Sequence, residues 1–452
     1  MSKPPTFRPR RPRPATPPPA HRTSHILRTN ILAGRTRNGR INPVATLRNI
    51  SNLATLGTCP VKQDCGACAF VNTDYDASLA EKFKRGLGIL EQGKLLEGAK
   101  VLPPLASPRQ LGYRTLFKLA VRPSESAEPE SRFALGLFKP GTHKLGPELT
   151  RCPIHVQPLA RLIRDLKSAL DASPLKPFDE QTASGDVRYV VARSAHLTGE
   201  LMVTFVVSSP VRMELQRIVS KLKAREHKIH AAFMNIHSGD GNAIFGGETV
   251  HLFGAKGLRE RLCELDFEVG PTAFFQINPW QASNLYRRVE QVAGTGSSKS
   301  VAWDLYCGIG QISLLLARAG FRTLGVEENP SAIEDARINA VKNSLSERAE
   351  FITARVEASE SLFPKWASAP NIIVVNPSRR GLHEDARAHI AHVLRTNPQC
   401  RFVYVSCEVE TMARDLAVLT GAGFHIRQVE AFDMFAQTDN LEWMAVLTAR
   451  PH

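Results

Sequence analysis

The chain has 452 residues, more than one hydrophobic core ordinarily takes, so two or three domains are expected. No apolar run approaches the roughly 20 residues that span a bilayer, and there is no signal-peptide core, which argues against an integral membrane protein or a secreted one and predicts a soluble, cytoplasmic chain. The net charge is +15, and most of it lies in residues 1–50, which hold ten Arg and one Lys but no Asp or Glu.

Residues 1–50 are predicted to form a disordered basic tail. They combine many prolines with few apolar residues, and such a composition cannot bury a core. The arginines would contact phosphate groups without sequence preference. A transit peptide is a rival interpretation, because those segments are also rich in Arg and poor in acids, but the proline clusters oppose the amphipathic helix that they need. A solvated extension with no role is the third alternative.

Three cysteines lie close together after this tail, and a fourth follows at a distance. Cys59, Cys65 and Cys68 stand in CPVKQDCGAC, and Cys152 stands in TRCPIH. In a reducing cytosol, clustered cysteines are more often metal ligands than disulfides. Zinc and a four-iron cluster both accept four thiolates, but the C-x5-C gap is longer than zinc sites usually have. The spacing therefore favours an iron–sulfur cluster over zinc.

Residues 51–264 are predicted to form a β-rich domain, which the cysteine set would close. A helix is expected over residues 76–96, and two more over residues 155–170 and 211–224. Strand-like alternation covers residues 113–121, 132–138, 188–193, 201–207 and 231–236. Basic residues among these strands suit nucleic acid but equally suit solubility; they are Arg114, Lys118, Lys139 and Lys144.

From about residue 265 to residue 452, strands and helices alternate, which predicts an α/β domain with a mainly parallel sheet and helices on both faces. Its first helix is expected to start at Asn278 and Pro279, a good cap and first-turn pair. The buried strands are expected over residues 301–305, 321–326, 372–375 and 402–405. The last two strands, over residues 424–431 and 442–448, are expected to close the sheet as a hairpin.

The stretch WDLYCGIG passes from a buried strand through a turn into a helix, as nucleotide pockets of open α/β sheets do. Gly308 and Gly310 let the backbone bend and approach a ligand, but the third glycine of a dinucleotide fingerprint is missing. Glu327 ends the next strand, where a carboxylate can accept hydrogen bonds from both hydroxyls of a ribose; a plain helix cap is the alternative. The pattern favours a nucleoside ligand, of which S-adenosylmethionine is the common one.

Polar residues follow several strands of the predicted sheet. Since the carboxyl ends of parallel strands meet in one crevice, Glu327, Asn376 and Cys407 should share a site with Tyr306 and Gly308. Cys407 precedes a helix predicted over residues 410–419, and a helix N-terminus lowers a thiol pKa and favours thiolate. Taken alone, Cys407 fits a small buried residue equally well. The remaining cysteines are expected to be structural: Cys263, Cys307 and Cys400.

A thiolate beside a methyl-sulfonium donor suggests one reaction. Carbon 5 of uracil becomes nucleophilic enough to take a methyl group only after a nucleophile has added to carbon 6. A base must then remove the proton from carbon 5 so that the thiolate can leave. Glu442, in the stretch DNLEWMAVL, is the carboxylate best placed by the pattern, although an ordinary strand-end acid would look the same.

Taken together, these residues make the chain resemble the RNA uridine-5-methyltransferase family. Within it, the chain is similar to the iron–sulfur branch of RlmC-like and RlmD-like proteins, which methylate uridines of 23S ribosomal RNA. The resemblance runs from about Cys59 to the C-terminus and rests on motifs in a fixed order. They are CPVKQDCGAC with TRC, AFFQINPWQASNLY, WDLYCGIGQISL, GVEENPSAIEDARINA, NPSRRG, VSCEVETMARDL and FDMFAQTDNLEWMAVL.

The resemblance implies a class I methyltransferase (Rossmann-like) sheet whose last strand is antiparallel, and an enzyme that methylates carbon 5 of uridine in RNA. It implies Cys407 as the nucleophile and Glu442 as the base. The residues that it implies as S-adenosylmethionine contacts are Gln276, Tyr306, Glu327 and Asn376. The ligands that it implies for a [4Fe-4S] cluster are Cys59, Cys65, Cys68 and Cys152.

Two positions depart from the family pattern. The usual DPPR or NPPR motif reads NPSRRG here, with Ser378 in place of the second proline, which could loosen the loop that grips the flipped base. Arg355 stands in a region that usually carries an acid for the adenine of the cofactor, so that contact stays unassigned.

The target is expected to be a single-stranded loop of RNA, because the enzyme must take a uracil out of its stack. Ribosomal RNA is favoured: the tRNA-specific branch lacks the cysteine set, and the tail is too short for a TRAM module, which makes RlmC-like proteins the closer match. A tRNA uridine-5-methyltransferase and a non-catalytic RNA-binding protein with a degenerate cofactor pocket are the alternatives. Cytosine-5 and adenine-N6 methylation are disfavoured, because NPSRRG holds neither a cysteine nor an aromatic residue. We expect a monomer with no obligate protein partner.

Overall fold

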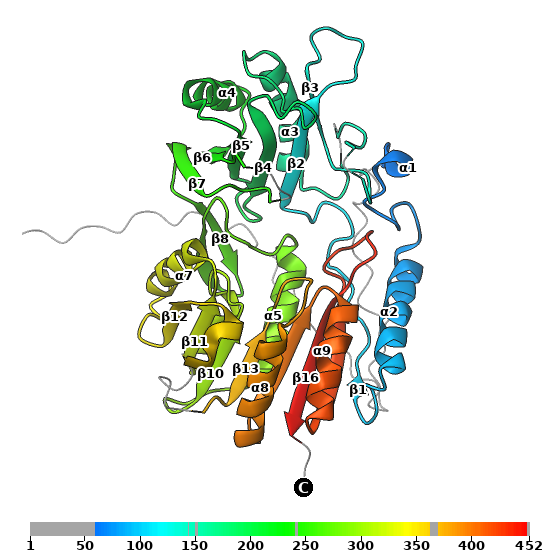
Figure 1. Ribbon diagram of the computed structural model, residues 1–452, viewed down its shortest axis with the longest axis vertical. Coiled ribbons are helices and arrows are strands. Elements are labelled where there is room, and N and C mark those ends of the chain that lie inside the picture. Colours follow the sequence, from blue (N-terminus) through cyan, green and yellow to red (C-terminus); the bar gives the residue numbers. More distant parts are fainter. Residues whose placement is uncertain (1–58, 143, 150–151, 240–242, 362–368, 450–452) are drawn as a thin grey trace, which may run out of the picture. The chain divides into compact units, whose positions relative to one another are not determined.

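The computed structural model describes residues 59–449 except 143, 150–151, 240–242 and 362–368, and the predicted basic tail of residues 1–50 lies outside the described residues. The described strands form a six-stranded sheet, an eight-stranded sheet and a two-stranded ribbon. Figure 1 shows these strands with the helices that pack beside them. Among the described residues, no helix combines the length and the apolar character that crossing a membrane requires.

The six-stranded sheet has the order β3-β2-β4-β5-β6-β7. Its strands are β2 (Leu116–Pro123), β3 (Phe133–Gly136), β4 (Val187–Ser194), β5 (Leu201–Val207), β6 (Ile229–Ile236) and β7 (Glu248–Gly254). All neighbouring strands are antiparallel except β5 and β6, which are parallel because α4 (Arg212–Ala224) connects them as a crossover.

The two faces of this sheet pack into different clusters of buried residues. Phe117, Val190 and Val203 project from alternate positions of β2, β4 and β5 into a core that α4 and α3 (Gln157–Asp171) complete. This alternation is the period-two signal from which strands β2 to β6 were predicted, and those predictions are confirmed. Strand β7 was not predicted, because most of its side chains are exposed at the sheet edge and no alternation marks it.

The eight-stranded sheet has the order β1-β15-β16-β14-β13-β10-β11-β12. Its strands are β1 (Lys100–Val101), β10 (Val301–Leu305), β11 (Arg322–Glu327), β12 (Ala349–Thr353), β13 (Ile372–Val375), β14 (Arg401–Ser406), β15 (Phe424–Phe432) and β16 (Glu442–Ala449). Strands β10 to β14 are parallel, and β16 is antiparallel to both β14 and β15. The predicted parallel sheet, its closing hairpin and its antiparallel last strand are confirmed.

Both faces of this sheet are covered by helices. On β10, Val301 and Trp303 enter one buried cluster while Ala302 enters another, and Ile372 and Ile373 of β13 divide in the same way. A strand buried on both faces reads as a continuous apolar run, which is how these strands were found in the sequence. The helices are α5 (Pro279–Ala293), α6 (Gln311–Arg318), α7 (Pro330–Lys342), α8 (Glu384–Thr396) and α9 (Val409–Gly421).

A segment from early in the chain belongs to the packing of this second sheet. Strand β1 pairs in parallel with β15, and α2 (Tyr75–Gln92) lies alongside α9 (Figure 1). Phe83 of α2 stacks on Trp443 with ring centroids 5.7 Å apart. Gly86 permits this approach, because a Cβ there would lie 2.1 Å from Cζ2 of the Trp443 ring. The domain boundaries at residues 50, 51, 264 and 265 stay predictions.

A two-stranded ribbon and a short helix lie outside the two large sheets. The ribbon consists of β8 (Leu258–Leu262) and β9 (Leu265–Val269), an antiparallel hairpin whose main chain α7 holds through Asn339 and Asp335. The short helix α1 (Lys62–Cys65) lies within the cysteine motif and ends at Gly66, whose φ of 64° is the left-handed conformation that glycine adopts readily. Gly66 therefore allows the close turn between Cys65 and Cys68.

Candidate active site

A single cavity of about 810 Å³ receives residues from both large sheets. Its lining includes all ten residues that the sequence singled out for catalysis, cofactor binding or metal binding. They are Cys59, Cys65, Cys68, Cys152, Gln276, Tyr306, Glu327, Asn376, Cys407 and Glu442. The predicted convergence of strand ends is therefore found in the fold.

The glycine turn after β10 forms one wall of the cavity. Tyr306, Gly308 and Gly310 have φ values of 66°, 54° and 83°, so the chain bends through three left-handed residues. A Cβ on Gly310 would lie 2.9 Å from the Phe351 ring, which only glycine avoids, whereas a Cβ on Gly308 would meet open space. Gly308 thus leaves its backbone accessible to a ligand in the cavity.

Glu327 ends β11 and faces this turn. Its Oε2 accepts a hydrogen bond from Gly308 N at 3.2 Å, and its Oε1 accepts one from Asn329 N at 3.0 Å. Two backbone donors fix the carboxylate at the cavity wall and leave further acceptor positions on each oxygen. Arg355, the departure noted in the sequence, is exposed and lies 3.7 Å from Glu328 and 3.2 Å from Glu357.

Asp304 and Gln311 also line the cavity, and sequence reasoning missed both. Ser313 donates hydrogen bonds to Oδ2 of Asp304 from its N and Oγ at 2.8 and 2.6 Å. Within the described residues, Oδ1 of Asp304 and Nε2 of Gln311 are buried without a hydrogen-bond partner. Burial raises the pKa of Asp304 to about 7. Buried polar atoms are normally satisfied, so this pair indicates that a polar ligand belongs in the cavity.

Cys407 follows β14, and Glu442 begins β16. The pKa of Cys407 is raised to about 11, mainly by burial and also by the nearby Glu442 carboxylate, while the Arg379 guanidinium, which hydrogen-bonds the thiol, lowers it. The pKa of Glu442 is raised to about 8 by burial, and the charge of Arg379 lowers it. The predicted lowering of the Cys407 pKa by a helix N-terminus is wrong for the free protein, because desolvation outweighs it.

Arg379 belongs to the loop NPSRRG, which also brings Asn376, Pro377 and Ser378 to the cavity. The buried carboxylate of Asp415 holds this loop, because its Oδ2 accepts hydrogen bonds from Leu382 N at 2.7 Å and from the Tyr404 hydroxyl at 2.7 Å. A Cβ on Gly381, whose φ is 74°, would meet Asp415 Oδ2 at 2.5 Å. Asp415 holds the chain at Gly381 and Leu382, which come after Ser378 in the sequence. This contact does not require a proline at position 378.

The four predicted cluster ligands are free thiols at one part of the cavity wall. Burial raises the pKa of Cys68 to about 12, and the neighbouring thiolates of Cys152, Cys65 and Cys59 add to the rise. Within the described residues, no group of three or more His, Cys, Asp or Glu is arranged to hold a metal ion. Four cysteine thiols are a donor set that zinc and a four-iron cluster both accept. The other cysteines, Cys263, Cys307 and Cys400, are buried as expected.

Three comparisons place this chain among known proteins. The family model described as tRNA (uracil-5-)-methyltransferase matches residues 188–450. An uncharacterized RNA methyltransferase of Oceanobacillus iheyensis is 30% identical over 87% of this chain and 83% of its own length. Another, of Gloeobacter violaceus, is 32% identical over 86% of this chain and 82% of its own.

A solved structure agrees with these relatives. The crystal structure of Pyrococcus abyssi tRNA (uracil-54, C5)-methyltransferase in complex with S-adenosyl-L-homocysteine has a TM-score of 0.65 and 27% identity, covering 83% of this chain and 84% of that one. The predictions of a class I methyltransferase fold, of an enzyme and of S-adenosylmethionine as its methyl donor are confirmed. The chain belongs to the tRNA (uracil-5-)-methyltransferase family, and it is an enzyme that uses S-adenosylmethionine to methylate carbon 5 of uracil in RNA.

Proposed function

We propose that this enzyme methylates one uridine of 23S ribosomal RNA through a covalent intermediate on Cys407, with Glu442 as the base. The observation that carries the proposal is that Cys407 and Glu442 line the same cavity as the glycine turn and Glu327. A nucleophile, a base and a cofactor wall must share one space for this reaction, and residues at the ends of β10, β11, β14 and β16 meet there.

Cys407 acts on the pyrimidine ring first. Its thiolate adds to carbon 6 of uracil, which places the ring electrons on carbon 5 as an enolate. S-adenosylmethionine, when bound, supplies the electrophilic methyl group that carbon 5 attacks. Arg379 favours the thiolate, because its charge opposes the rise of the Cys407 pKa that burial causes. Entry of RNA brings the polar ring against this side chain and replaces part of the solvation that burial removed.

Glu442 completes the reaction. Its carboxylate removes the proton from carbon 5 of the methylated adduct, the ring electrons return, and the bond between carbon 6 and the Cys407 sulfur breaks. Burial holds the pKa of Glu442 near 8, which is close to the working pH and suits a base that must both accept and release a proton. Arg379 again stabilises the charged form.

The cofactor contacts divide between two parts of the wall. Glu327 would accept hydrogen bonds from the ribose hydroxyls, while Gln276, Tyr306 and Asn376 would contact the rest of the cofactor from the other strand ends. Asp304 and Gln311 extend this set, because Oδ1 of Asp304 suits a cationic or hydrogen-bond-donating group and Nε2 of Gln311 suits an acceptor. The cofactor has both kinds of group on its amino-acid end.

We also propose that Cys59, Cys65, Cys68 and Cys152 hold a [4Fe-4S] cluster. Four free thiols at one part of the wall support this, because thiolates so placed repel each other unless a cationic centre binds them. The cluster would fix the fold around the RNA-binding part, since uracil methylation needs no electron. Anaerobically purified protein is expected to show visible charge-transfer absorbance with about four iron atoms per chain; stoichiometric zinc without that absorbance would contradict the proposal.

The RNA target can be tested in cells. Ribosomal RNA from a strain that lacks the gene is expected to have lost one 5-methyluridine that a plasmid-borne copy restores. Transfer RNA is the second candidate, and the likeness to the Pyrococcus abyssi enzyme favours it. Loss of 5-methyluridine from transfer RNA alone would overturn the assignment of ribosomal RNA as the target but would leave the proposed reaction in place. No loss from either RNA would contradict the proposed function.

A further inference from the structure

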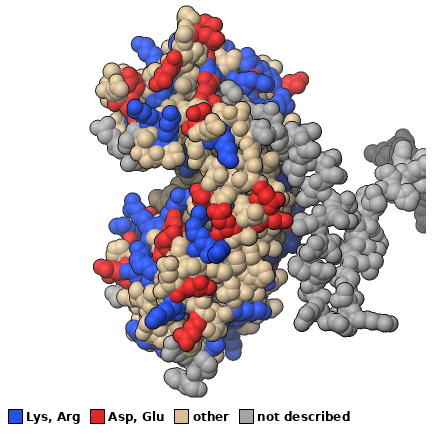
Figure 2. Space-filling view, turned by 90° about the vertical axis from the view of Figure 1, so that its right-hand side faces the viewer, with Lys and Arg blue, Asp and Glu red and all other residues tan. Residues whose placement is uncertain are grey.

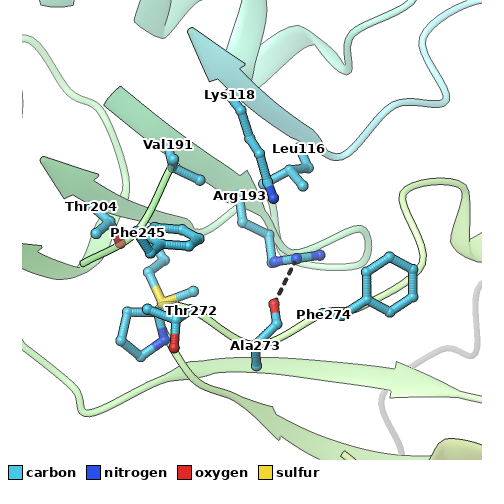
Figure 3. Close-up of a pocket in the computed structure, with 11 residues that line it drawn as sticks. Leu116, Lys118, Val191, Arg193, Thr204, Phe245, Thr272, Ala273 and Phe274 are labelled. Carbon is cyan, nitrogen blue, oxygen red and sulfur yellow. Dashed lines mark hydrogen bonds between the residues drawn. The ribbon is translucent and has the colours of Figure 1, made fainter. Parts of the chain in front are cut away.

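A second, smaller cavity of about 110 Å³ lies on the face of the six-stranded sheet that points away from the α3 and α4 core (Figure 3). Alternate residues of three neighbouring strands form its floor, and a short stretch before α5 and one aromatic side chain complete it. The floor consists of Leu116 and Lys118 of β2, Val191 and Arg193 of β4, and Met202 and Thr204 of β5. The other side consists of Phe245, Pro271, Thr272, Ala273 and Phe274.

The cavity is too small for a drug-sized ligand but roomy enough for one planar ring. Its walls are mostly apolar, and Phe245 offers an aromatic face. Phe274 is 61% exposed, which is unusual for a phenylalanine in a folded enzyme. An exposed aromatic beside an apolar slot is the kind of surface on which nucleobases stack.

Two cations stand at the edge of this slot. Arg193 is buried and fixed, since its guanidinium donates to Phe275 O at 3.2 Å and to Ala273 O at 3.4 Å, the second bond being drawn in Figure 3. Lys118 points into the same space with Nζ 5.5 Å from the centre of the Phe245 ring. Desolvation lowers the pKa of Lys118, and repulsion from Arg193 and Arg114 lowers it further. A phosphate group would relieve this repulsion.

The small cavity adjoins the catalytic one. Leu116, Lys118 and Phe274 line both, so a chain that places one unit in the large cavity can place its neighbour in the small one. Surface charge gives no comparable guide, because the face drawn in Figure 2 mixes Lys and Arg with Asp and Glu.

We propose that the small cavity binds the nucleotide next to the target uridine, with its base against Phe245 and its phosphate at Lys118. This inference rests on the proposed function and adds a specificity site to it. The target uracil would occupy the cavity of Cys407, and one flanking base would leave its own stack at the same time. Recognition of that base would help the enzyme to choose among single-stranded uridines.

Binding of short RNAs to the whole protein tests the site. The probe is a fluorescent pentanucleotide with one central uridine between adenosines, measured in the presence of S-adenosylhomocysteine, and two further probes lack the base on the 5′ or on the 3′ side of the uridine. Loss of the correct flanking base is expected to weaken binding about 10-fold in the wild type, as loss of one stacked base does. Phe245→Ala should weaken binding of the complete probe by a similar factor. This variant should then bind the complete probe and the probe that lacks the flanking base equally well.

Lys118→Ala tests the phosphate contact. It is expected to lower the slope of log affinity against log salt by about one, as loss of one phosphate contact does. Lys223 and Phe253 supply the matched control, because they form the same kind of pair, with Nζ 3.9 Å from the ring centre, and line neither cavity. Lys223→Ala and Phe253→Ala should leave both the salt slope and the effect of the missing base as in the wild type.

Two results would overturn the proposal: no binding of the complete probe by the wild type, or equal effects of the missing bases in the wild type and in Phe245→Ala. Methyl transfer to total RNA of the deletion strain is measured in parallel with wild-type protein. Absence of that transfer contradicts the proposed function itself. If methyl transfer occurs but Phe245→Ala does not change the effect of a missing flanking base, only the proposed role of the small cavity is contradicted.

Discussion

Cys407 and Glu442 stand at neighbouring ends of the antiparallel strands β14 and β16. The last pair in that ladder is Ser406 with Trp443. Cys407 follows Ser406 and Glu442 precedes Trp443, so these two residues lie next to each other. Both side chains line the large cavity, and the Glu442 carboxylate raises the pKa of the Cys407 thiol. The strand register thus pairs the proposed nucleophile with the proposed base.

Cys407→Ala is expected to lower methyl transfer by more than about 1000-fold, because the route through carbon 6 has no substitute nucleophile. Affinity for S-adenosylmethionine should stay within a few-fold, since the residues proposed to contact the cofactor belong to other strand ends. Transfer of labelled methyl to RNA and calorimetric cofactor binding measure the two effects. Cys263→Ala, at a buried cysteine outside the cavity, is the control and should keep activity. Wild-type activity in Cys407→Ala would refute the nucleophile assignment.

Glu442→Gln is expected to trap the methylated RNA on Cys407. The amide keeps the size of the side chain but cannot remove the proton from carbon 5, so addition and methyl transfer occur and release does not. A protein–RNA band that survives denaturing electrophoresis measures the trapped species. The double variant Cys407→Ala with Glu442→Gln should give no such band. A stable band in the double variant would mean that another residue carries the RNA.

The activity is expected to rise with pH through about 8, following the two shifted groups. Glu442 has a pKa near 8, so below that value the base is protonated and cannot accept a proton. Cys407 has a pKa near 11, so the thiolate fraction also grows as the pH rises. Deprotonation of either group therefore raises the rate. The value of kcat/KM should increase continuously between pH 6 and pH 9, with no range at low pH where it stays constant. A flat profile over that range would contradict these roles.

Arg379 should set the position of this pH profile. Its charge opposes the upward shifts of both pKa values, so Arg379→Ala is expected to move the rise of kcat/KM to higher pH while S-adenosylmethionine binding changes little. Neighbouring Arg380, on the same loop but outside the cavity, provides the matched variant Arg380→Ala, whose profile should overlay the wild type. A uniform loss of rate in Arg379→Ala at every pH would assign it a purely structural role.

The sequence predicted the elements whose signal is local. Strands β10 and β13 match their predicted ranges residue for residue, because burial on both faces leaves continuous apolar runs. The convergence of Glu327, Asn376 and Cys407 followed from one rule about parallel sheets. Strand β1 could not be predicted, since two residues carry no periodicity and its partner β15 lies more than 300 residues later in the chain.

The parts of the site that the sequence did not reveal depend on tertiary burial. Arg379 looks like any loop arginine until the fold brings it against Cys407 and Glu442. The raised pKa of Cys407 has the same origin, because the helix after it was visible in the sequence and the desolvation around it was not. Asp304 sits inside an apolar strand, and that position was the one signal in the sequence, since a carboxylate in a buried run needs a partner.

Lys82 and Asp433 form a buried ion pair that fixes α2 to the loop before Glu442. Lys82 Nζ lies 2.6 Å from Asp433 Oδ1, with side chains 1% and 0% exposed, and the Tyr75 hydroxyl donates to Oδ2 at 2.8 Å. Lys82→Met leaves the carboxylate buried without its cation, so the free energy of unfolding is expected to fall by about 3–5 kcal/mol, measured by urea denaturation. Adding Asp433→Asn should recover part of this loss, because the amide keeps a hydrogen bond to Tyr75 without a buried charge.

The same helix and loop supply the control for this pair. Arg85 lies 3.5 Å from Asp439, with side chains 50% and 57% exposed, so Arg85→Met should cost no more than about 1 kcal/mol. The two ion pairs differ mainly in burial, since both cations belong to α2 and both carboxylates belong to the loop between β15 and β16. Comparing the two variants therefore tests how much burial adds to the stability cost. Because that loop leads into Glu442, Lys82→Met should also slow methyl transfer at temperatures where the protein is still folded. Equal stability losses in Lys82→Met and Arg85→Met would show that the buried pair does not hold the loop.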